Sequence, residues 1–407
     1  MSERKIDNGE WKTENDLSDL SACPAQAEWR EFQLKNIAQI NPTERLPKGT
    51  VAKKVAMEVL QPFTKKISTY TLEEYKGGVK FRNGDTVMAR ITPSLENGKT
   101  AYVDILDDDE VGYGSTEFIV LRENEGISDK HFLYYFAISP ELRDIAILSM
   151  TGSSGRQRVQ TDVVKQLEFL LPPLPEQKAI AEVLSSLDDK IDLLHRQNKT
   201  LEQMAQTLFR QWFVIDARED WEERVLPDEF DFTMGQSPLG KTFNESGIGM
   251  PMFQGNADFG FRFPSERVYT TDPKRLAKPL DTLISVRAPV GAQNMAEKQC
   301  CIGRGVAAFR YKLNPDFYTY TYFKLESLME KIKRFNDEGT VFGSISKGDF
   351  LQMEILIPPE NLVKKFESEA KPINDKVIKN CKQIRTLESL RDTLLPKLMS
   401  GEIRVKF

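Results

Sequence analysis

The sequence has few residues that could bind a metal ion or form disulfide bonds. Its 407 residues include four cysteines and two histidines, namely Cys23, Cys300, Cys301, Cys381, His131 and His195. The cysteines form no C-x-x-C pair, and the whole set does not supply a standard zinc site. Four scattered cysteines also make a poor disulfide framework, so we expect a protein of a reducing cytoplasm with no metal site of its own.

Long apolar runs and an excess of basic charge are also lacking. No stretch of 18 apolar residues occurs and the N-terminus is polar, so we expect neither a membrane span nor a signal peptide. The net charge is −5, from 56 basic and 61 acidic residues. This excludes a uniformly basic nucleic-acid coat but permits local basic faces. Residues 1–28 alone carry seven acids against three bases, and their low apolar content predicts a mobile acidic tail.

Signatures of catalysis are largely missing. No G-x-G-x-x-G follows a predicted strand, and no Ser/His/Asp or Cys/His pairing stands out. Residues 235–242, GQSPLGKT, match the phosphate-loop pattern G-x-x-x-x-G-K-[ST], which needs a buried strand before it and a helix after it. Here the preceding residues are acidic, and the following ones contain two glycines and a proline. We interpret this segment as a turn and expect no enzymatic activity and no cofactor in this chain.

The strongest positive feature is an internal repeat. Residues 167–213 and 353–399 align without a gap over some 40 residues, at a constant offset of 186. The matching residues include Pro172–Pro173 with Pro358–Pro359, Asp189–Lys190 with Asp375–Lys376, and Thr200–Glu202 with Thr386–Glu388. Upstream, GDTVMARITP (84–93) resembles LDTLISVRAP (280–289), with one residue slipped in before Arg287. Two related halves in tandem predict two related tasks.

The repeat predicts an α+β protein with pseudo-two-fold symmetry. We expect an acidic tail (1–28), a mixed α/β domain (29–172), a long helix (173–215), a second mixed α/β domain (216–358) and a second long helix (359–402). Apolar residues at alternating spacings of four and three form a heptad seam in each helix, interrupted by Asn198 in the first and Asn380 in the second.

The two seams predict an antiparallel coiled coil formed by the two helices. When the midpoints of the two heptad seams are placed opposite each other, the residue numbers of any two facing residues add up to about 578. Asn198 then faces Asn380, and Arg391 faces Leu187 beside Asp188. A buried Asn pair specifies register at some cost in stability. The alternative is that each helix packs only on its own domain.

At the paired Pro-Pro motifs and helices, the sequence resembles the specificity subunit of a type I restriction–modification system. The most specific part is LPPLPEQKAIAEVLSSLDDKIDLLHRQNKTLEQMAQTLFRQWFV (171–214), while residues 234–255 and 283–291 resemble target-recognition domains. The resemblance implies that each domain reads one half of a split sequence in double-stranded DNA. The helices would set the spacer and dock two methyltransferase subunits, joined by restriction subunits with motor and nuclease activity. S-adenosylmethionine, ATP and Mg²⁺ would belong to those partners.

Base reading is expected to fall to a few loops in each domain. The candidates in the first domain are Arg90, Thr92, Ser153, Ser154, Arg156, Gln157 and Arg158. By the repeat, those in the second domain are Arg287, Ser344, Ser346 and Lys347. Arginine suits guanine edges, glutamine suits adenine and serine serves either. Two other interpretations remain open: a coiled-coil scaffold that reads no DNA and, more remotely, a phosphate-loop enzyme.

Overall fold

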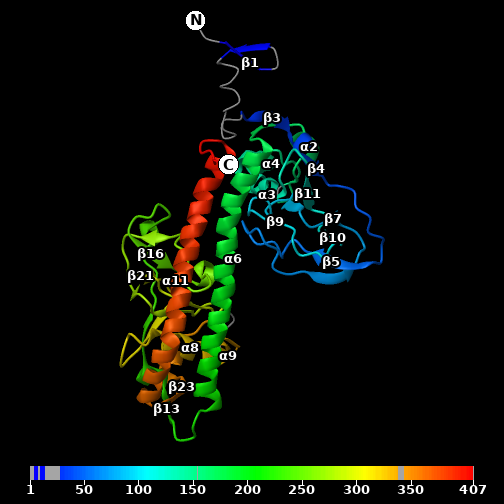
Figure 1. Ribbon diagram of the computed structural model, residues 1–407. Coiled ribbons are helices and arrows are strands. Elements are labelled where there is room, and N and C mark those ends of the chain that lie inside the picture. The colour runs from blue at the N-terminus through cyan, green and yellow to red at the C-terminus, as the bar shows by residue number, and fades with distance from the viewer. Residues whose placement is uncertain (1–3, 8–9, 14–27, 154, 338–342, 407) are drawn as a thin grey trace. The chain divides into compact units, whose positions relative to one another are not determined.

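The chain forms two compact units that share its two long helices. In the computed structural model, residues 4–7, 10–13, 28–153, 155–337 and 343–406 are described. Unit 1 comprises Met1–Ile191 and Thr386–Phe407, and unit 2 comprises Asp192–Arg385. Helix α6 (Leu174–Arg210) passes from unit 1 into unit 2, and α11 (Glu360–Met399) passes from unit 2 back into unit 1 (Figure 1). The predicted α+β class, with mixed α/β domains and two long helices, is confirmed.

Unit 1 contains three sheets besides the strand pair β1 (Arg4–Asp7) and β2 (Glu10–Thr13), which lies in the segment expected to be a mobile tail. The sheets have the orders β6-β5-β10-β7, β4-β11-β8-β9 and β12-β3. Their strands are β3 (Arg30–Gln33), β4 (Ala38–Ile40), β5 (Val51–Val55), β6 (Thr71–Glu74), β7 (Val79–Phe81), β8 (Thr86–Ala89), β9 (Thr100–Tyr102), β10 (Gly112–Gly114), β11 (Phe118–Glu123) and β12 (Glu168–Leu171). The shorter helices are α2 (Leu34–Ile37), α3 (Lys130–Ile138), α4 (Pro140–Leu148) and α5 (Thr161–Val164).

Unit 2 has sheets of order β14-β22-β19-β20, β15-β17-β16-β21-β18 and β13-β23. Their strands are β13 (Glu222–Val225), β14 (Phe230–Met234), β15 (Phe243–Asn244), β16 (Met250–Phe253), β17 (Tyr269–Thr270), β18 (Leu276–Ala277), β19 (Thr282–Ser285), β20 (Gln293–Met295), β21 (Cys300–Ile302), β22 (Val306–Tyr311) and β23 (Glu354–Ile357). The shorter helices are η3 (Gln211–Ile215), α7 (Leu226–Glu229), η4 (Gly240–Thr242), η5 (Asn256–Asp258), α8 (Tyr318–Ser327), α9 (Met329–Asp337) and α10 (Lys347–Gln352).

The two units repeat one topology, as the internal repeat predicts. In each unit a four-stranded antiparallel sheet has its second strand paired to the first and third: β11 to β4 and β8, and β22 to β14 and β19. Each unit also contains a parallel pair of strands in another of its sheets, β5 with β10 in unit 1 and β16 with β21 in unit 2. The strand before each Pro-Pro pairs with the first strand of its domain, β12 with β3 and β23 with β13.

A buried ion pair recurs at the same place in both units. Arg122 Nε donates to Asp85 Oδ1 at 2.7 Å in unit 1, and Arg310 Nε donates to Asp281 Oδ1 at 2.8 Å in unit 2. Each aspartate is buried directly before the central strand β8 or β19. Because a buried carboxylate is costly unless it is paired and hydrogen-bonded, the arginine one strand away stabilises it. The internal repeat therefore extends to the atoms of this ion pair.

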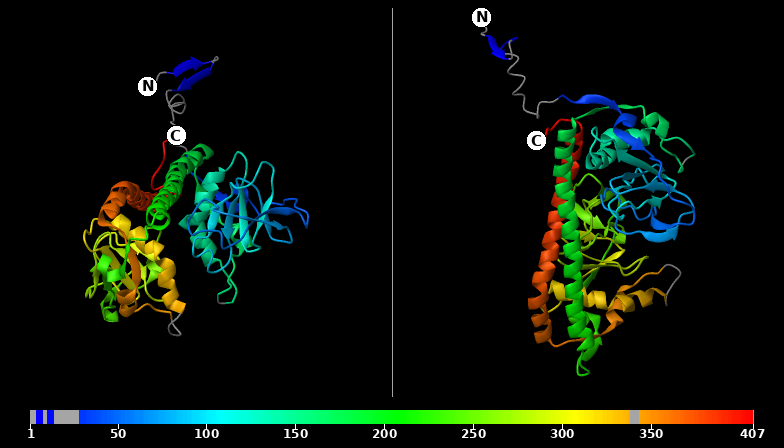
Figure 2. Two further views of the ribbon diagram at one scale, coloured as in Figure 1. Left: turned by 90° about the horizontal axis from the view of Figure 1, so that it is seen from below. Right: turned by 45° about the vertical axis from the view of Figure 1, so that its right-hand side comes forward.

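Helices α6 and α11 run antiparallel, side by side, within each unit (Figure 2). In unit 2, Asn380 Nδ2 donates to Asn198 Oδ1 at 2.9 Å, and both residues are buried. In unit 1, Arg391 Nη1 lies 2.8 Å from Asp188 Oδ1. Both contacts have the register expected from the seams. Apolar seam residues such as Ile180, Leu184 and Leu194 are buried around them.

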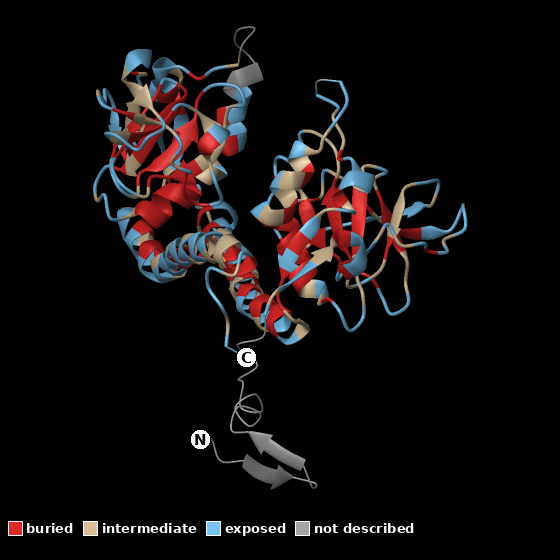
Figure 3. Ribbon diagram, turned by 90° about the horizontal axis from the view of Figure 1, so that it is seen from above, coloured by how far each residue is buried: buried red, intermediate tan, exposed pale blue. Residues whose placement is uncertain are grey.

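Each unit has its own main hydrophobic core, built on these helices (Figure 3). In unit 1, all of α3 from Phe132 to Ile138 is buried, and it packs with Ile180 and Leu184 of α6 and Leu398 of α11. A helix that is apolar all round requires cover on every side, which the sheet and the two long helices supply. The long helices are therefore part of the core of each unit.

Candidate nucleic-acid interface

In unit 1 the structure brings together the two segments that carry the predicted base-reading residues. The chain after β8 lies beside the loop that contains Thr151 and Arg158, because Ile91 forms a bridge with Arg158 and Arg158 with Thr151. The backbone N–H of Thr92 donates to the carbonyl oxygen of Gln157 at 3.0 Å, and the N–H of Val159 donates to that of Arg90 at 2.9 Å. Two segments about 65 residues apart in the chain thus lie side by side. We call residues 90–93, 117, 151–153 and 155–158 the unit 1 edge.

The predicted residues differ in their accessibility on this edge. Ser153 and Arg156 are exposed, whereas Arg90, Thr92, Gln157 and Arg158 are partly buried. Ser154 lies outside the described residues. The hydroxyl of Thr92 donates to the carbonyl oxygen of Gln157 at 3.2 Å, so this side chain also holds the loop. Among the three arginines of this edge, Arg156 is the exposed one and is therefore the most accessible to a partner molecule.

Sequence reasoning missed one central residue of the edge, Glu117. Its carboxylate accepts hydrogen bonds from Arg158, at 3.0 Å from Nε and 2.6 Å from Nη2, and lies 3.9 Å from Nε of Arg90. The hydrogen bond from Arg158 lowers the pKa of Glu117, and the same bond raises the pKa of Arg158. No local motif marks Glu117, because only the pairing of β11 with β8 brings it to the arginines.

The equivalent edge of unit 2 has the same backbone contacts but different side chains. The N–H of Val286 donates to the carbonyl oxygen of Gly305 at 2.9 Å, as Arg90 does to Glu117 in unit 1. The N–H of Ile345 donates to the carbonyl oxygen of Val286 at 3.0 Å, as Val159 does to Arg90. We call residues 286–289, 305 and 343–345 the unit 2 edge. It has Val286, Gly305 and Ser344 in the places of Arg90, Glu117 and Arg158, so it has neither that carboxylate nor those two arginines.

The repeat alignment at Arg287 was wrong by one residue. Ser344 forms a bridge with Arg287, and Arg158 forms the matching bridge with Ile91. Strand β19 pairs with β22 in the register in which β8 pairs with β11, so residues 84–93 match 280–289 without an inserted residue. Arg287 therefore corresponds to Ile91. It is exposed on the edge, but it does not occupy the place of Arg90.

Ser346 and Lys347 lie just beyond the unit 2 edge, at the start of α10. The hydroxyl of Ser346 accepts a hydrogen bond from the N–H of Asp349 at 3.3 Å, and the carboxylate of Asp349 accepts one from the N–H of Ser346 at 2.7 Å. This reciprocal capping box satisfies helix-terminal donors and accounts for the Ser346 side chain. Both residues remain exposed, while Ser344 is the one that lies on the edge.

The comparisons with known proteins agree with this architecture. Residues 26–203 match the model of the type I restriction modification DNA specificity domain. A putative type I restriction enzyme MjaX specificity subunit of Methanocaldococcus jannaschii is 28% identical over 409 residues, which cover 93% of this chain and 94% of that one. The HindI specificity subunit of Haemophilus influenzae is 24% identical, with 79% and 87% covered.

The chain belongs to the family of type I restriction–modification specificity subunits. Its fold agrees with that assignment. The crystal structure of a type I restriction–modification system S subunit from M. genitalium is similar, with a TM-score of 0.60 and 19% identity over 92% of this chain and 96% of that one. The family model ends within α6, so the second half of this specificity subunit is related to the model through the internal repeat.

The phosphate-loop pattern of this specificity subunit lies in a structure that does not cradle phosphate. After β14, residues 235–239 form a loop, and residues 240–242 form the single 3₁₀ turn η4. Strand β15 follows directly, so no α-helix presents its N-terminal amides there. The interpretation of this segment as a turn is confirmed by the geometry.

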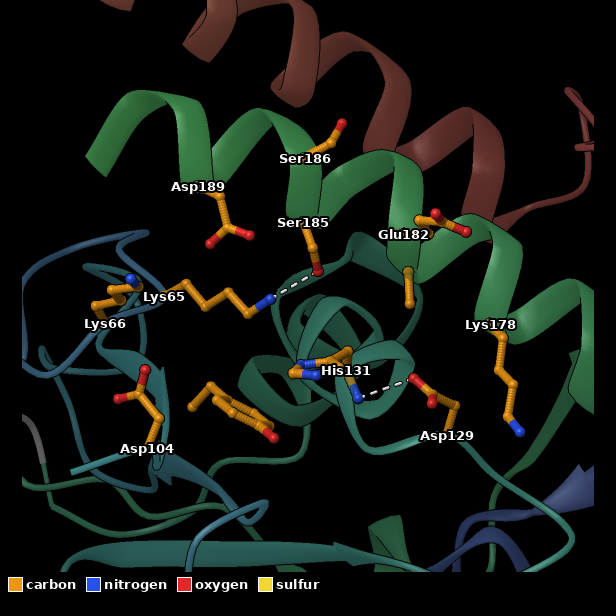
Figure 4. A pocket seen from close by; sticks show the side chains of 12 residues that line it. Lys65, Lys66, Asp104, Asp129, His131, Lys178, Glu182, Ser185, Ser186 and Asp189 are labelled. Carbon is orange, nitrogen blue, oxygen red and sulfur yellow. Dashed lines mark hydrogen bonds between the residues drawn. The ribbon is translucent and has the colours of Figure 1, made fainter. Parts of the chain in front are cut away.

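A polar pocket of about 450 Å³ lies in unit 1 between α6 and the start of α3 (Figure 4). Lys65 points across it and donates to Ser185 Oγ at 2.7 Å, and burial lowers the pKa of this lysine. Basic and acidic side chains both line it: Lys65, Lys66, Lys178, His131, Asp104, Asp129, Glu182 and Asp189. Its mixed charge is unlike the basic surface that a nucleic-acid backbone requires.

Because His131 lies half-buried in this pocket, we expect the stability of the folded protein to depend on pH. Its ring centroid lies 4.6 Å from that of Tyr102, its Nδ1 is buried without a partner, and burial lowers its pKa below 6.5. The unfolded chain therefore binds more protons, and stability falls as the pH drops below about 6.5. We expect His131→Gln to reduce this loss, measured as the free energy of unfolding between pH 7.5 and 5. Exposed His195 provides the matched control, and an equal effect of His195→Gln would contradict the prediction.

Two structural features are absent from the described part of the chain. No helix there is long and apolar enough to cross a membrane. No cluster of three or more His, Cys, Asp or Glu side chains there has the arrangement needed to hold a metal ion.

Proposed function

We propose that this chain is the DNA sequence-recognition subunit of a type I restriction–modification complex. Each globular domain reads one half of a bipartite site in double-stranded DNA. Helices α6 and α11 set the spacer between the halves and provide the docking surface for two methyltransferase subunits, to which restriction subunits are added. The chain itself contributes sequence choice and no catalysis, while S-adenosylmethionine, ATP and Mg²⁺ are used by the partner subunits.

The observation that carries this proposal is the pair of edges. One backbone arrangement occurs twice, held by the same hydrogen bonds, but the side chains on it differ. In unit 1 the edge presents Arg90, Glu117 and Arg158, and in unit 2 the same places hold Val286, Gly305 and Ser344. A conserved frame with exchanged side chains is what two readers of different base sequences require, because the donors and acceptors in the major groove differ between base pairs.

The charge of the chain supports a reader that works within a larger assembly. A net charge of −5 supplies little of the phosphate neutralisation on which most DNA affinity depends. Phosphate contacts position a protein on DNA, whereas base contacts specify the sequence. In this proposal the partner subunits make many of the phosphate contacts, and the two edges make the base contacts.

The test is co-expression of the full chain with its methyltransferase subunit, followed by sequencing of methylated bases in the host DNA. We expect one split motif, with two short halves around a fixed gap and methylation on adenine. A stable complex that yields no motif would overturn the proposal and favour a coiled-coil scaffold that reads no DNA. Methylation at unsplit sites would exclude the two-reader arrangement.

A further inference from the structure

The guanidinium of Arg158 is held from one side only. Glu117 accepts its Nε–H at 3.0 Å and one hydrogen of Nη2 at 2.6 Å, which is a side-on, two-point contact. Nη1 lies 3.4 Å from the carbonyl oxygen of Arg156, a long contact that occupies at most one of its two hydrogens. A guanidinium has five N–H donors in one plane. One hydrogen of Nη1 and one of Nη2 therefore remain, side by side at the end of the group.

This remaining pair of donors is suited to one kind of base edge. Two parallel N–H groups match the two acceptors O6 and N7 of guanine in the major groove. The Arg158 side chain is 42% exposed, so its free end is accessible, while the Glu117 side chain is 24% exposed beneath it. The carboxylate restricts the rotation of the arginine before any DNA arrives. Less side-chain entropy is then lost on binding, which favours selective contact.

The charge of Glu117 does not prevent the approach of DNA. Its carboxylate is paired with Arg158 and also lies 3.9 Å from Nε of Arg90. Exposed Arg156 adds a further positive charge on the same loop. With three arginines and one glutamate, the edge carries a net charge of about +2, which favours a polyanion.

We propose that the half-site read by unit 1 contains a G·C pair whose guanine is bound end-on by Arg158, and that Glu117 is the positioning residue for this contact. The inference rests on the proposed function and specifies one base pair of it. Unit 2 provides an internal comparison. Gly305 and Ser344 take the places of Glu117 and Arg158, so the equivalent position there cannot make the same contact.

The experiment uses the complex of the full chain with its methyltransferase subunit. The motif is determined first, and methylation rates are then measured on duplexes carrying each base pair at each position of both halves. Arg158→Lys keeps the positive charge but removes the two parallel N–H donors of the guanidinium. We expect discrimination at one G·C pair to fall roughly tenfold to a hundredfold, with the other half-site and the gap unchanged. In Arg158→Gln the preference at that pair should move towards adenine.

Four further variants separate positioning from a general effect on folding. Glu117→Gln should weaken discrimination at the same pair, and Glu117→Asp should restore part of it. Arg156→Ala should lower methylation about equally for all bases, as loss of a phosphate contact does. Arg287→Lys in unit 2 should leave the half-site of unit 1 unchanged.

The outcomes distinguish this inference from the proposed function. A split motif whose halves are unaffected by both Arg158 variants overturns the guanine contact and leaves the proposed function standing. Relaxation at an A·T pair also overturns it. Equal loss for all bases in Glu117→Gln overturns the positioning role. Absence of any split motif in the unaltered complex overturns the proposed function itself.

Discussion

Replacing Asp188 with alanine is expected to destabilise unit 1 by about 3–5 kcal/mol. Asp188 accepts hydrogen bonds from Arg391 Nη1 of α11 at 2.8 Å and from the hydroxyl of Tyr135 of α3 at 2.6 Å. The side chains of Asp188 and Arg391 are 8% and 10% exposed. The substitution removes the buried counter-charge of the Arg391 guanidinium and leaves it only the exposed carboxylate of Asp392, 2.9 Å from Nη2. Removing the buried partner of such a pair costs far more than the pair itself contributes.

The measurement is the unfolding of the full chain by urea or heat. For a unit of about 200 residues, the expected loss lowers the unfolding temperature by roughly 6–20 °C. Hydrogen exchange should localise the effect to α3 and to residues 386–399 of α11. Arg196→Ala is the control on α6, because this arginine is exposed and paired only with Asp192, as a surface i,i+4 pair.

A triple variant tests the physical reason for this effect. Asp188→Leu with Arg391→Leu and Tyr135→Phe removes the carboxylate together with the two groups that donate to it, and apolar replacements of buried ion pairs are often neutral or stabilising. We expect it to recover most of the lost stability. A loss below about 1 kcal/mol for Asp188→Ala would show that the network adds little to the attachment of the domain to the two helices.

Lengthening both long helices by one turn is expected to widen the spacer of the DNA site by about two base pairs. Four residues add about 6 Å to a helix, at about 1.5 Å each, and a base pair occupies about 3.4 Å. Insertion after Leu193 in α6 and after Arg385 in α11 places both turns at the same level of the antiparallel pair, as judged from Asn198 opposite Asn380. The seams therefore stay in register on both sides of the insertions.

The control places the same four residues in α6 alone. In that variant the contacts Asn198–Asn380 and Asp188–Arg391, which lie on opposite sides of the insertion, can no longer both form, so it should lose the stable complex. Methylated-base sequencing reports the gap in the matched variant. Both half-sites should keep their sequences. An unchanged gap would mean that the two helices do not determine the spacer.

The sequence alone predicted the features that depend on local periodicity and on the repeat. The heptad seams located the long helices, and the polar interruptions at Asn198 and Asn380 indicated the antiparallel register. Such patterns are readable because a helix presents every third or fourth residue to its partner. The sequence also placed base-reading candidates after β8 and in the Gly-rich loop that contains Arg156 and Arg158, and the structure brings the chain after β8 beside Arg158.

Only the tertiary structure decided which side chains meet on the two edges. The sequence alignment paired Arg287 with Arg90 because both are arginines. The register of β19 on β22 instead makes Arg287 equivalent to Ile91, and Arg287 forms a bridge with Ser344. Glu117 had no sequence signal, since its partners Arg90 and Arg158 are 27 and 41 residues away in the chain. Strand pairing is a non-local choice, and a shift of one residue turns a side chain to the opposite face. The sequence therefore determined the two-domain plan and its helices, while the packing of strands decided the chemistry of each reading edge.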